Sequence, residues 1–160
     1  MDLDKTTFIA ANAIVELEPV FQAFVVPNSR IPENFTFVQL RTLYLLQHFG
    51  RLTISEIADH HCVTKQHMSQ TIPIMEKMGL VERSKDAGNK KNEYFSITDS
   101  GLAFLNEYSL MAAEHFGELL AGISEEEKEE ITVCCDRLKN VISRVLERSH
   151  PLYLKKKNRK

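Results

Sequence analysis

The sequence predicts a mainly α-helical protein with one small β-hairpin. Apolar residues recur at steps of three and four along most of the chain, which is the helical pattern. Only two short segments, residues 80–83 and 93–97, have the content of strands. Residues that break helices are sparse, since the 160 residues include 6 Gly and 5 Pro.

The composition predicts one or two domains of a soluble, cytoplasmic protein. A chain of 160 residues buries roughly two-thirds of its unfolded surface, which is enough for a core. The three cysteines, Cys62, Cys134 and Cys135, are too few for a disulfide framework and favour a reducing cytosol. The sequence contains no run of about 18 apolar residues, so no membrane span is predicted. Residues 1–5 contain two aspartates where a signal peptide would be basic, so no signal peptide is predicted.

The first two helices are predicted over residues 6–26 and from Thr36 to near Gly50. Pro19 interrupts the apolar stripe of the first, so we expect a kink or two shorter helices there. Residues 26–32 contain two prolines and are typical of a loop. The second helix is expected to turn four side chains inward: Leu40, Leu43, Tyr44 and Leu46.

A helix, a turn, a second helix and a hairpin are predicted next. Thr53 and Glu56 have the spacing of a capping box, which starts a short helix that runs to His60. Thr64 caps the second helix, which runs to Met78 and ends before Gly79. The two strands follow, joined by a polar tip at residues 84–92. This order predicts a winged helix-turn-helix lobe over residues 36–97.

Two long helices are predicted after this lobe. Thr98 caps the first, which ends at Gly122 and is about 37 Å long. Ser124 begins the second with a capping box and three glutamates. Their apolar stripes contain Leu102, Leu105, Leu110, Ala112, Phe116 and Leu119, and then Ile131, Cys134, Leu138, Val141, Ile142 and Val145. Because such helices exceed what a small lobe covers, residues 1–30 and 98–150 are predicted to form a homodimerisation region.

The helix that starts at Thr64 is predicted to contact double-stranded DNA. Its core side is Met68, Thr71, Ile72, Met75 and Met78, and the opposite arc is Lys65, Gln66, Ser69, Gln70 and Pro73. This arc has no acidic residue before Glu76, and Gln, Ser and Lys pair well with bases or phosphates. An ordinary polar surface explains the same pattern equally well. The predicted DNA contacts on this helix are Thr64, Lys65, Gln66, His67, Ser69 and Gln70.

The hairpin strengthens the prediction of nucleic-acid binding. Residues 65–91 hold six cationic against three anionic side chains, although the whole chain has a net charge of −2. Four of the cations, Arg83, Lys85, Lys90 and Lys91, surround the tip, where they can bind phosphates or enter a minor groove. Lys85, Lys90 and Lys91 are the predicted contacts. The basic tail at residues 151–160 is expected either to attract DNA without specificity or only to aid solubility.

Residues 36–101 resemble the MarR family of bacterial transcriptional regulators. The matching segments are residues 36–40, 52–58, 63–70, 75–83 and 97–101, of which Val-Thr-Lys-Gln-His-Met-Ser-Gln and Met-Glu-Lys-Met-Gly-Leu-Val-Glu-Arg are the most specific. The resemblance implies a homodimer with recognition helices in successive major grooves and wings on the flanking backbone. It also implies a pocket for small aromatic or anionic effectors, to which Phe35, Arg41, Tyr44 and His48 would contribute, although core packing or surface exposure explains these residues too.

The chain departs from the family pattern at the hairpin tip. The family carries Asp-x-x-Asp-Arg-Arg, whereas this chain has Asp86-Ala87-Gly88-Asn89-Lys90-Lys91. Asn89 cannot form the acid–arginine pair that stiffens the wing, and lysine does not replace a bidentate arginine. A less rigid wing that contacts phosphates is therefore the hypothesis. Pro73, inside the recognition helix, is expected to bend it rather than abolish function.

Other kinds of function receive less support. The His60, His61, Cys62 and His67 cluster lacks the spacing of a metal site and is more simply read as polar residues of a turn, so no metal or cofactor is expected. No catalytic motif indicates an enzyme. The resemblance implies that a peroxide sensor of this family would use an N-terminal cysteine, and the first cysteine here is Cys62, which argues against that function. The sequence thus predicts a DNA-binding regulator modulated by an effector; the alternative is a winged-helix protein-interaction module without specific DNA binding.

Overall fold

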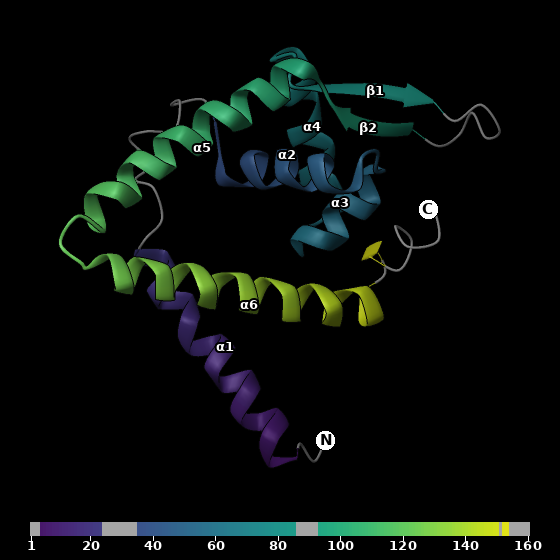
Figure 1. Cartoon of the computed structure of the whole chain (residues 1–160). Coiled ribbons are helices and arrows are strands. Elements are labelled where there is room, and N and C mark those ends of the chain that lie inside the picture. Colours follow the sequence, from purple (N-terminus) through teal and green to yellow (C-terminus); the bar gives the residue numbers. More distant parts are fainter. Residues whose placement is uncertain (1–3, 24–34, 86–92, 151, 154–160) are drawn as a thin grey trace.

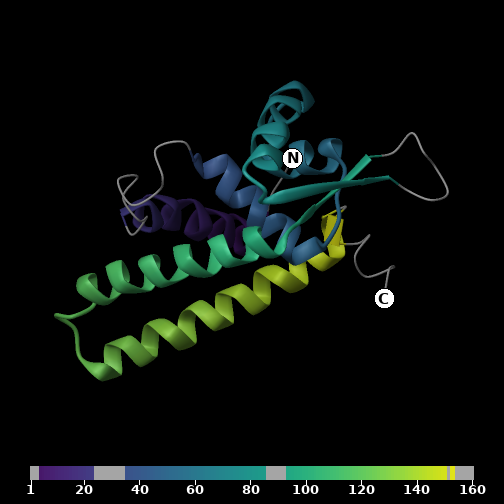
Figure 2. The ribbon, with the colours of Figure 1, turned by 90° about the horizontal axis from the view of Figure 1, so that it is seen from above.

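The computed structural model describes residues 4–23, 35–85, 93–150 and 152–153. The elements are α1 (Lys5–Ala23), α2 (Phe37–Phe49), α3 (Ile54–His61), α4 (Lys65–Lys77), β1 (Val81–Lys85), β2 (Glu93–Ile97), α5 (Asp99–Leu119) and α6 (Glu125–Ser149). The mainly helical class with one hairpin is confirmed. Figure 1 shows α2, α3, α4 and the hairpin gathered into one lobe, which α5 leaves. Helix α6 then returns, and its C-terminal end lies beside the lobe (Figure 2).

Helices α2 to α6 begin at the predicted hydroxyl caps. Thr36, Thr53 and Ser124 each form a capping box, in which the side-chain oxygen accepts an N–H bond and the residue three later binds back. Thr64 and Thr98 accept single bonds from the N–H groups of His67 and Gly101, at 3.1 and 3.0 Å. These bonds satisfy backbone donors that have no partner within the helix, and so fix where each helix starts.

The core lies where α2, α3, α4, the hairpin and the start of α5 meet. Phe95 in β2 is fully buried together with leucines of α2, Ile57 of α3 and Met68 of α4. The antiparallel register places Val81 opposite Ile97 and Arg83 opposite Phe95. Backbone bonds of 3.0 and 2.8 Å between Leu52 and Phe95 attach the segment before α3 to the hairpin. This arrangement packs the buried side of α4 against the rest of the lobe.

Two side chains predicted to face the core lie at the surface instead. Tyr44 is 39% exposed, and its hydroxyl lies 3.3 Å from the hydroxyl of Ser109 in α5. A phenol retains a polar tip that needs a partner, so partial exposure suits it. Met78 is also 39% exposed because it is the C-cap of α4, where the helical periodicity ends.

The long helices also differ from the sequence prediction. Helix α1 continues past Pro19 as one element, and α5 ends at Leu119 rather than Gly122. No residue of α6 is buried. The predicted inward residues that lie exposed are Leu110, Leu119, Ile131, Cys134, Val141 and Val145. The physical reason is that no other element of the described chain covers these apolar stripes.

Some predictions lie outside the described residues. Lys90 and Lys91 belong to the hairpin tip, and the basic tail is described only at residues 152–153. Within the described ranges, no helix combines the length and the apolar content needed to cross a membrane.

Candidate nucleic-acid interface and adjoining cavity

The predicted DNA-contacting side chains of α4 share one exposed surface, which we call the α4 edge. Met68, Ile72 and Met75 are fully buried and anchor the opposite side of the helix in the core. Because α4 has a period of about 3.6 residues, its other side must then face solvent. The α4 edge comprises Thr64, Lys65, Gln66, His67, Ser69 and Gln70, all of which are exposed.

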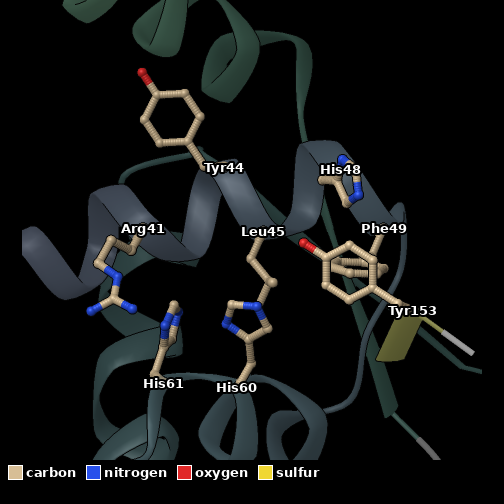
Figure 3. Close-up of a pocket in the computed structure, with 8 residues that line it drawn as sticks. All are labelled: Arg41, Tyr44, Leu45, His48, Phe49, His60, His61 and Tyr153. Carbon is tan, nitrogen blue, oxygen red and sulfur yellow. The ribbon is translucent and has the colours of Figure 1, made fainter. Parts of the chain in front are cut away.

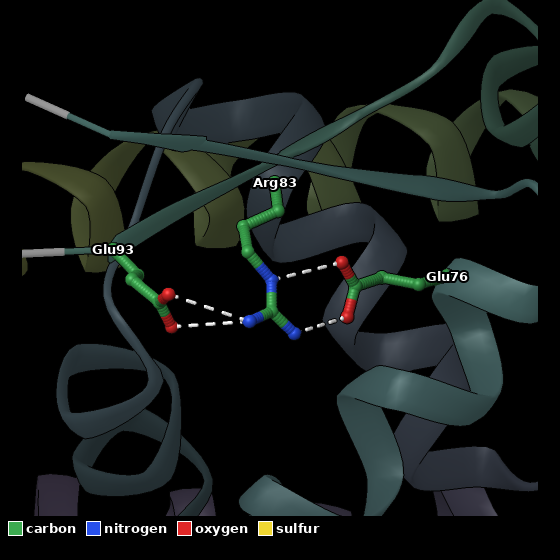
Figure 4. A network of polar contacts seen from close by, with 3 residues as sticks. All are labelled: Glu76, Arg83 and Glu93. Carbon is green, nitrogen blue, oxygen red and sulfur yellow. Dashed lines mark hydrogen bonds and ion pairs between the residues drawn. The ribbon is translucent and has the colours of Figure 1, made fainter.

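The acidic residue nearest to the α4 edge along the helix is paired with an arginine. Figure 4 shows Arg83 of β1 between Glu76 of α4 and Glu93 of β2. Its Nη2 and Nε donate to the two Glu76 oxygens at 2.8 and 3.1 Å, and Nη1 lies 3.3 Å from Glu93 Oε2. The guanidinium also lies 5.3 Å from the ring centroid of Phe95. The bidentate pair compensates Glu76 and fixes the hairpin against α4.

This network corrects one expectation from the sequence. Arg83 was counted among the cations around the hairpin tip that can bind DNA phosphates, but its donors are directed to two carboxylates of its own chain. Lys85, at the end of β1, is exposed, and Glu93 across the strand pair is already engaged by Arg83. Among the described residues of the hairpin, Lys85 is therefore the cation that remains accessible to DNA phosphates.

A cavity of about 240 Å³ lies between α2, α3 and the segment after α6. Figure 3 shows Arg41 beside His61, while Tyr44 points away from the centre of the cavity. Of the residues predicted for an effector pocket, Arg41, Tyr44 and His48 line this cavity. Phe35 does not, because it is buried 4.5 Å from the ring of Phe104. The remaining lining residues are Leu45, Phe49, His60, His61 and Tyr153.

The two adjacent histidines face this cavity from α3 rather than lying in a turn. His60 and His61 are the last residues of α3, and His61 follows the buried Ile57 by four positions. A spacing of four places the side chains of Ile57 and His61 on one face of the helix. This spacing is the sequence signal that could have identified His61 as a buried residue. Tyr153 gave no comparable signal, because its place in the cavity depends on how α6 packs.

Burial favours the neutral form of both imidazoles. Desolvation, followed by the positive charge of Arg41 and by His60, lowers the pKa of His61 to about 4. The pKa of His60 is lowered mainly by desolvation and also by His150, Arg41 and His48. The Nδ1 atoms of His60 and His61 are buried without a hydrogen-bond partner in the described residues.

The histidines and cysteines considered for a metal or redox site do not form such a site in the described residues. Among the residues whose positions are described, no three His, Cys, Asp or Glu side chains form a group able to hold a metal ion. Cys62, Cys134 and Cys135 are all exposed free thiols. Cys134 had been expected on the apolar, buried side of its helix, so that expectation was wrong.

Comparison with known proteins identifies the lobe. The model of the MarR family matches residues 35–92. The homoprotocatechuate degradative operon repressor of Escherichia coli is 24% identical over 99 residues, which cover 62% of this chain and 67% of that protein. A transcriptional regulator from Thermotoga maritima has a similar structure, with a TM-score of 0.68 at 16% identity, over 86% of this chain and 98% of that one.

A second solved structure includes nucleic acid. It is a mutant of MepR from S. aureus bound to an oligodeoxyribonucleotide, with a TM-score of 0.55 at 19% identity, over 88% of this chain and 99% of that chain. The structural likenesses show the shared fold, and the family match and the related repressor add the sequence relationship. Residues 35–92 thus resemble the MarR family in sequence, and the wider structural likenesses show that the chain shares the fold of these transcriptional regulators.

Proposed function

We propose that the protein acts as a homodimer that binds specific DNA sequences through the α4 edge. The observation that carries this proposal is the α4 edge itself, an exposed surface of amide, hydroxyl and cationic side chains without a carboxylate. The nearest carboxylate on the helix, Glu76, is compensated by Arg83. A polyanion can therefore approach this edge without repulsion.

The α4 edge and the hairpin have different proposed roles. Gln66 and Gln70 carry amides that can make two hydrogen bonds to one adenine in the major groove. Lys65 and Ser69 suit bases or phosphates, while Thr64 and His67 lie at the helix start, where phosphate contacts are favoured. Lys85, Lys90 and Lys91 would bind the flanking phosphates. These contacts add affinity for any sequence without selecting one.

A second copy of the chain would cover the exposed apolar residues of the terminal helices. Phe8, Ile9, Ile14 and Val15 on α1 and Ile131, Val133, Val141 and Val145 on α6 are between 43% and 69% exposed. Exposed large apolar side chains in such numbers are typical of helices that lie at an interface. A twofold dimer would present two α4 edges to one face of DNA about 34 Å apart, which is one helical turn. Such a regulator would act in the cytoplasm.

The cavity is the proposed effector site. It lies between the lobe that carries α4 and the C-terminal end of α6, so a ligand there contacts both regions. Arg41 offers a positive charge, and Phe49, His48 and Tyr153 offer rings, which together suit a small aromatic or anionic molecule. A ligand that binds better to the dimer whose two α4 helices have the spacing of the DNA-free state would shift the population toward that state and so lower the affinity for DNA.

A salt titration of duplex binding tests this function. With a pool-selected duplex and an unrelated one, we expect affinity to fall steeply with salt and to favour the selected sequence. Gln66→Ala should reduce the preference between the two, while Lys85→Ala should weaken both alike and flatten the salt dependence. Lys139→Ala, on α6 and off its apolar stripe, is the matched control. Weak binding that is insensitive to salt would instead favour a winged-helix protein-interaction module.

A further inference from the structure

The chain that follows α6 is attached to the lobe by His150, Leu152 and Tyr153, which we call the C-terminal latch. No residue of α6 itself is buried, whereas Leu152 belongs to the hydrophobic core. The ring of Tyr153 meets the ring of Phe49 in α2 edge to face, with the centroids 4.9 Å apart. Figure 3 shows Tyr153 lying against Phe49. The C-terminal latch therefore joins the end of α6 to the lobe that carries α4.

An imidazole of the lobe packs directly against this latch. The ring of His60 in α3 lies 5.4 Å from the ring of His150, measured between centroids. It also lies 6.3 Å from the ring of Phe49 and 5.5 Å from that of His61. Nδ1 of His60 is buried without a hydrogen-bond partner in the described residues. A proton on this ring would therefore place a charge among rings and away from water, which is unfavourable.

The charges around His60 also oppose a proton on it. Burial, followed by His150 after α6 and by Arg41 and His48 in α2, lowers the pKa of His60. No carboxylate is among these groups, and Asp59, the preceding residue of α3, is exposed. Because the latch covers His60 and brings His150 to it, an open latch leaves this imidazole easier to protonate.

His150 adds a second requirement for a neutral imidazole. Its Nδ1 accepts a hydrogen bond from the backbone N–H of Leu152 at 3.3 Å. An imidazolium carries protons on both ring nitrogens and accepts no hydrogen bond. This bond within the C-terminal latch therefore exists only while Nδ1 of His150 has no proton.

We propose that the C-terminal latch is an acid-sensitive switch, which is closed while His60 and His150 are neutral and opens when they take up protons. The protons come from solvent, and no other covalent bond changes. Opening releases the end of α6 from the lobe, so the orientation of the lobe relative to α6 is no longer fixed. The latch goes beyond the proposed function, but its effect on DNA rests on that function. Two α4 edges held at one spacing bind a duplex with a smaller loss of entropy than two free ones.

The direction of the pH dependence follows from the protons that each state binds. With the latch open, His60 regains an ordinary pKa of 6.5, so the open state binds more protons than the closed state. One proton then raises the ratio of open to closed latch by up to about tenfold between pH 7.5 and pH 5.5, and a proton on His150 adds to this. His61, whose pKa is about 4, stays neutral in that range.

Hydrogen exchange in the wild-type protein tests the latch directly. The Leu152 amide donates within the closed latch, so its protection reports the ratio of closed to open states. After correction for the intrinsic exchange rate, we expect this protection, measured by NMR, to be about five- to tenfold lower at pH 5.5 than at pH 7.5. Equal protection at the two pH values would overturn the proposal.

A double variant assigns the effect to the two histidines. His60→Phe keeps a ring at this position but cannot take up a proton, and in His150→Asn the side-chain oxygen can accept from the N–H two residues later. In the double variant, Leu152 protection should differ by less than about twofold between the two pH values. His115→Phe on α5 is the control and should lose as much protection as the wild type. An undiminished loss in the double variant contradicts the assignment.

A tryptophan in the latch gives a second measurement that leaves both histidines in place. The chain contains no tryptophan, so Tyr153→Trp introduces a single fluorophore beside Phe49. Its emission should move to longer wavelength between pH 7.5 and pH 5.5 as the latch opens, while circular dichroism shows unchanged helix content. An emission maximum that does not move with pH contradicts an opening latch.

Duplex binding separates the latch from the proposed regulator function. At pH 5.5 the wild type should bind the pool-selected duplex about three- to tenfold more weakly than the double variant, because only the wild-type latch opens. Equal affinities would overturn the link to DNA. If the latch responds to acid but no duplex sequence is preferred, the regulator function fails and the latch remains. If a sequence is preferred but Leu152 exchange ignores pH, only the latch fails.

Discussion

His61 shows how one buried side chain links packing to pH. The fold holds its imidazole neutral between Thr42, Arg41 and His60, whereas in the unfolded chain it has an ordinary pKa of 6.5. The unfolded chain therefore binds a proton at a higher pH than the folded chain does. It follows that stability attributable to His61 is present above about pH 6.5 and is lost as pH falls from there toward 4.

Acid stability measures this effect. We expect the free energy of unfolding by urea to fall by up to about 3 kcal/mol between pH 7 and pH 4 because of His61. His61→Gln should lower stability at pH 7 and reduce its decline toward pH 4, whereas His115→Gln should follow the wild-type curve. Parallel curves for His61→Gln and wild type would mean that His61 is not held neutral.

Arg83 shows that a surface ion pair can matter for binding more than for stability. Its side chain and that of Glu93 are about 40% exposed, so the pairs should contribute at most about 1 kcal/mol to folding. Because these ion pairs lie beside the α4 edge, we expect them to affect DNA binding. Without Arg83, the carboxylates of Glu76 and Glu93 would have no compensating charge from this arginine and would repel the DNA phosphates.

Opposite substitutions in this network should have opposite effects on duplex binding. Arg83→Gln is expected to weaken binding of all duplexes by about three- to tenfold at low salt, with a change of less than about 1 kcal/mol in folding stability. Glu76→Gln removes one of the two charges that hold Arg83 and should tighten binding. Fluorescence anisotropy against salt concentration measures both. Equal affinities for the two variants would exclude an electrostatic role for the network.

At the scale of elements, α5 is attached to the lobe by close contact at its first turn. A methyl group at Gly101 would collide with the carbonyl oxygen of Leu80 and lie 2.6 Å from Cγ1 of Ile97. Thr98, the N-cap, also donates to the carbonyl of Gly79 at 2.6 Å. Backbone atoms cannot move aside cheaply, so this junction fixes the direction in which α5 leaves the lobe.

Two identical substitutions in α5 test this junction. Gly101→Ala should lower the free energy of unfolding by about 2 kcal/mol or more, because the added methyl overlaps backbone. Gly117→Ala, where nothing lies within 4 Å, should raise it by about 0.5–1 kcal/mol through helix propensity. Urea unfolding followed by circular dichroism compares them. A similar effect of the two changes would show that Gly101 is not closely packed.

The elements differ in how far the sequence could predict them. Caps are local chemistry, so Thr53 with Glu56 or Ser124 with Glu127 identified helix starts directly. The lobe followed from the order of the predicted elements, and the exposed side of α4 followed from periodicity around buried residues such as Met68 and Ile72. Arg83 could not be assigned, because its partners Glu76 and Glu93 lie seven and ten positions away on separate elements. Phe35 and Tyr153 likewise depend on tertiary packing.

For the whole molecule, the apolar stripes of α1 and α6 require a covering that the described chain does not supply. The stripe of α6 was predicted to be buried, yet Ile131, Val141 and Val145 are 43–55% exposed. A pattern of spacing identifies an apolar face but not what lies against it. The proposed dimer explains the burial that the sequence predicted and relates two α4 edges by symmetry.

A charge on this stripe tests the dimer. Val141→Glu should shift the protein from dimer to monomer, because an interface cannot bury an unpaired carboxylate without a cost of several kcal/mol. Light scattering after size-exclusion chromatography measures the mass, and Arg144→Glu, off the stripe, is the control. We expect duplex affinity to fall with the dimer. A wild-type mass of one chain, 18.4 kDa, at micromolar concentration would refute the dimer.

Selection of sequences from a random duplex pool tests the central claim most directly. The account predicts an enriched pseudo-palindrome with half-sites about one helical turn, roughly 34 Å, apart. It also predicts that the base preference within each half-site relaxes in Gln66→Ala but is retained in Lys85→Ala. No enrichment, or an enriched single half-site with the same preference in wild type and Gln66→Ala, would contradict sequence reading by paired α4 edges.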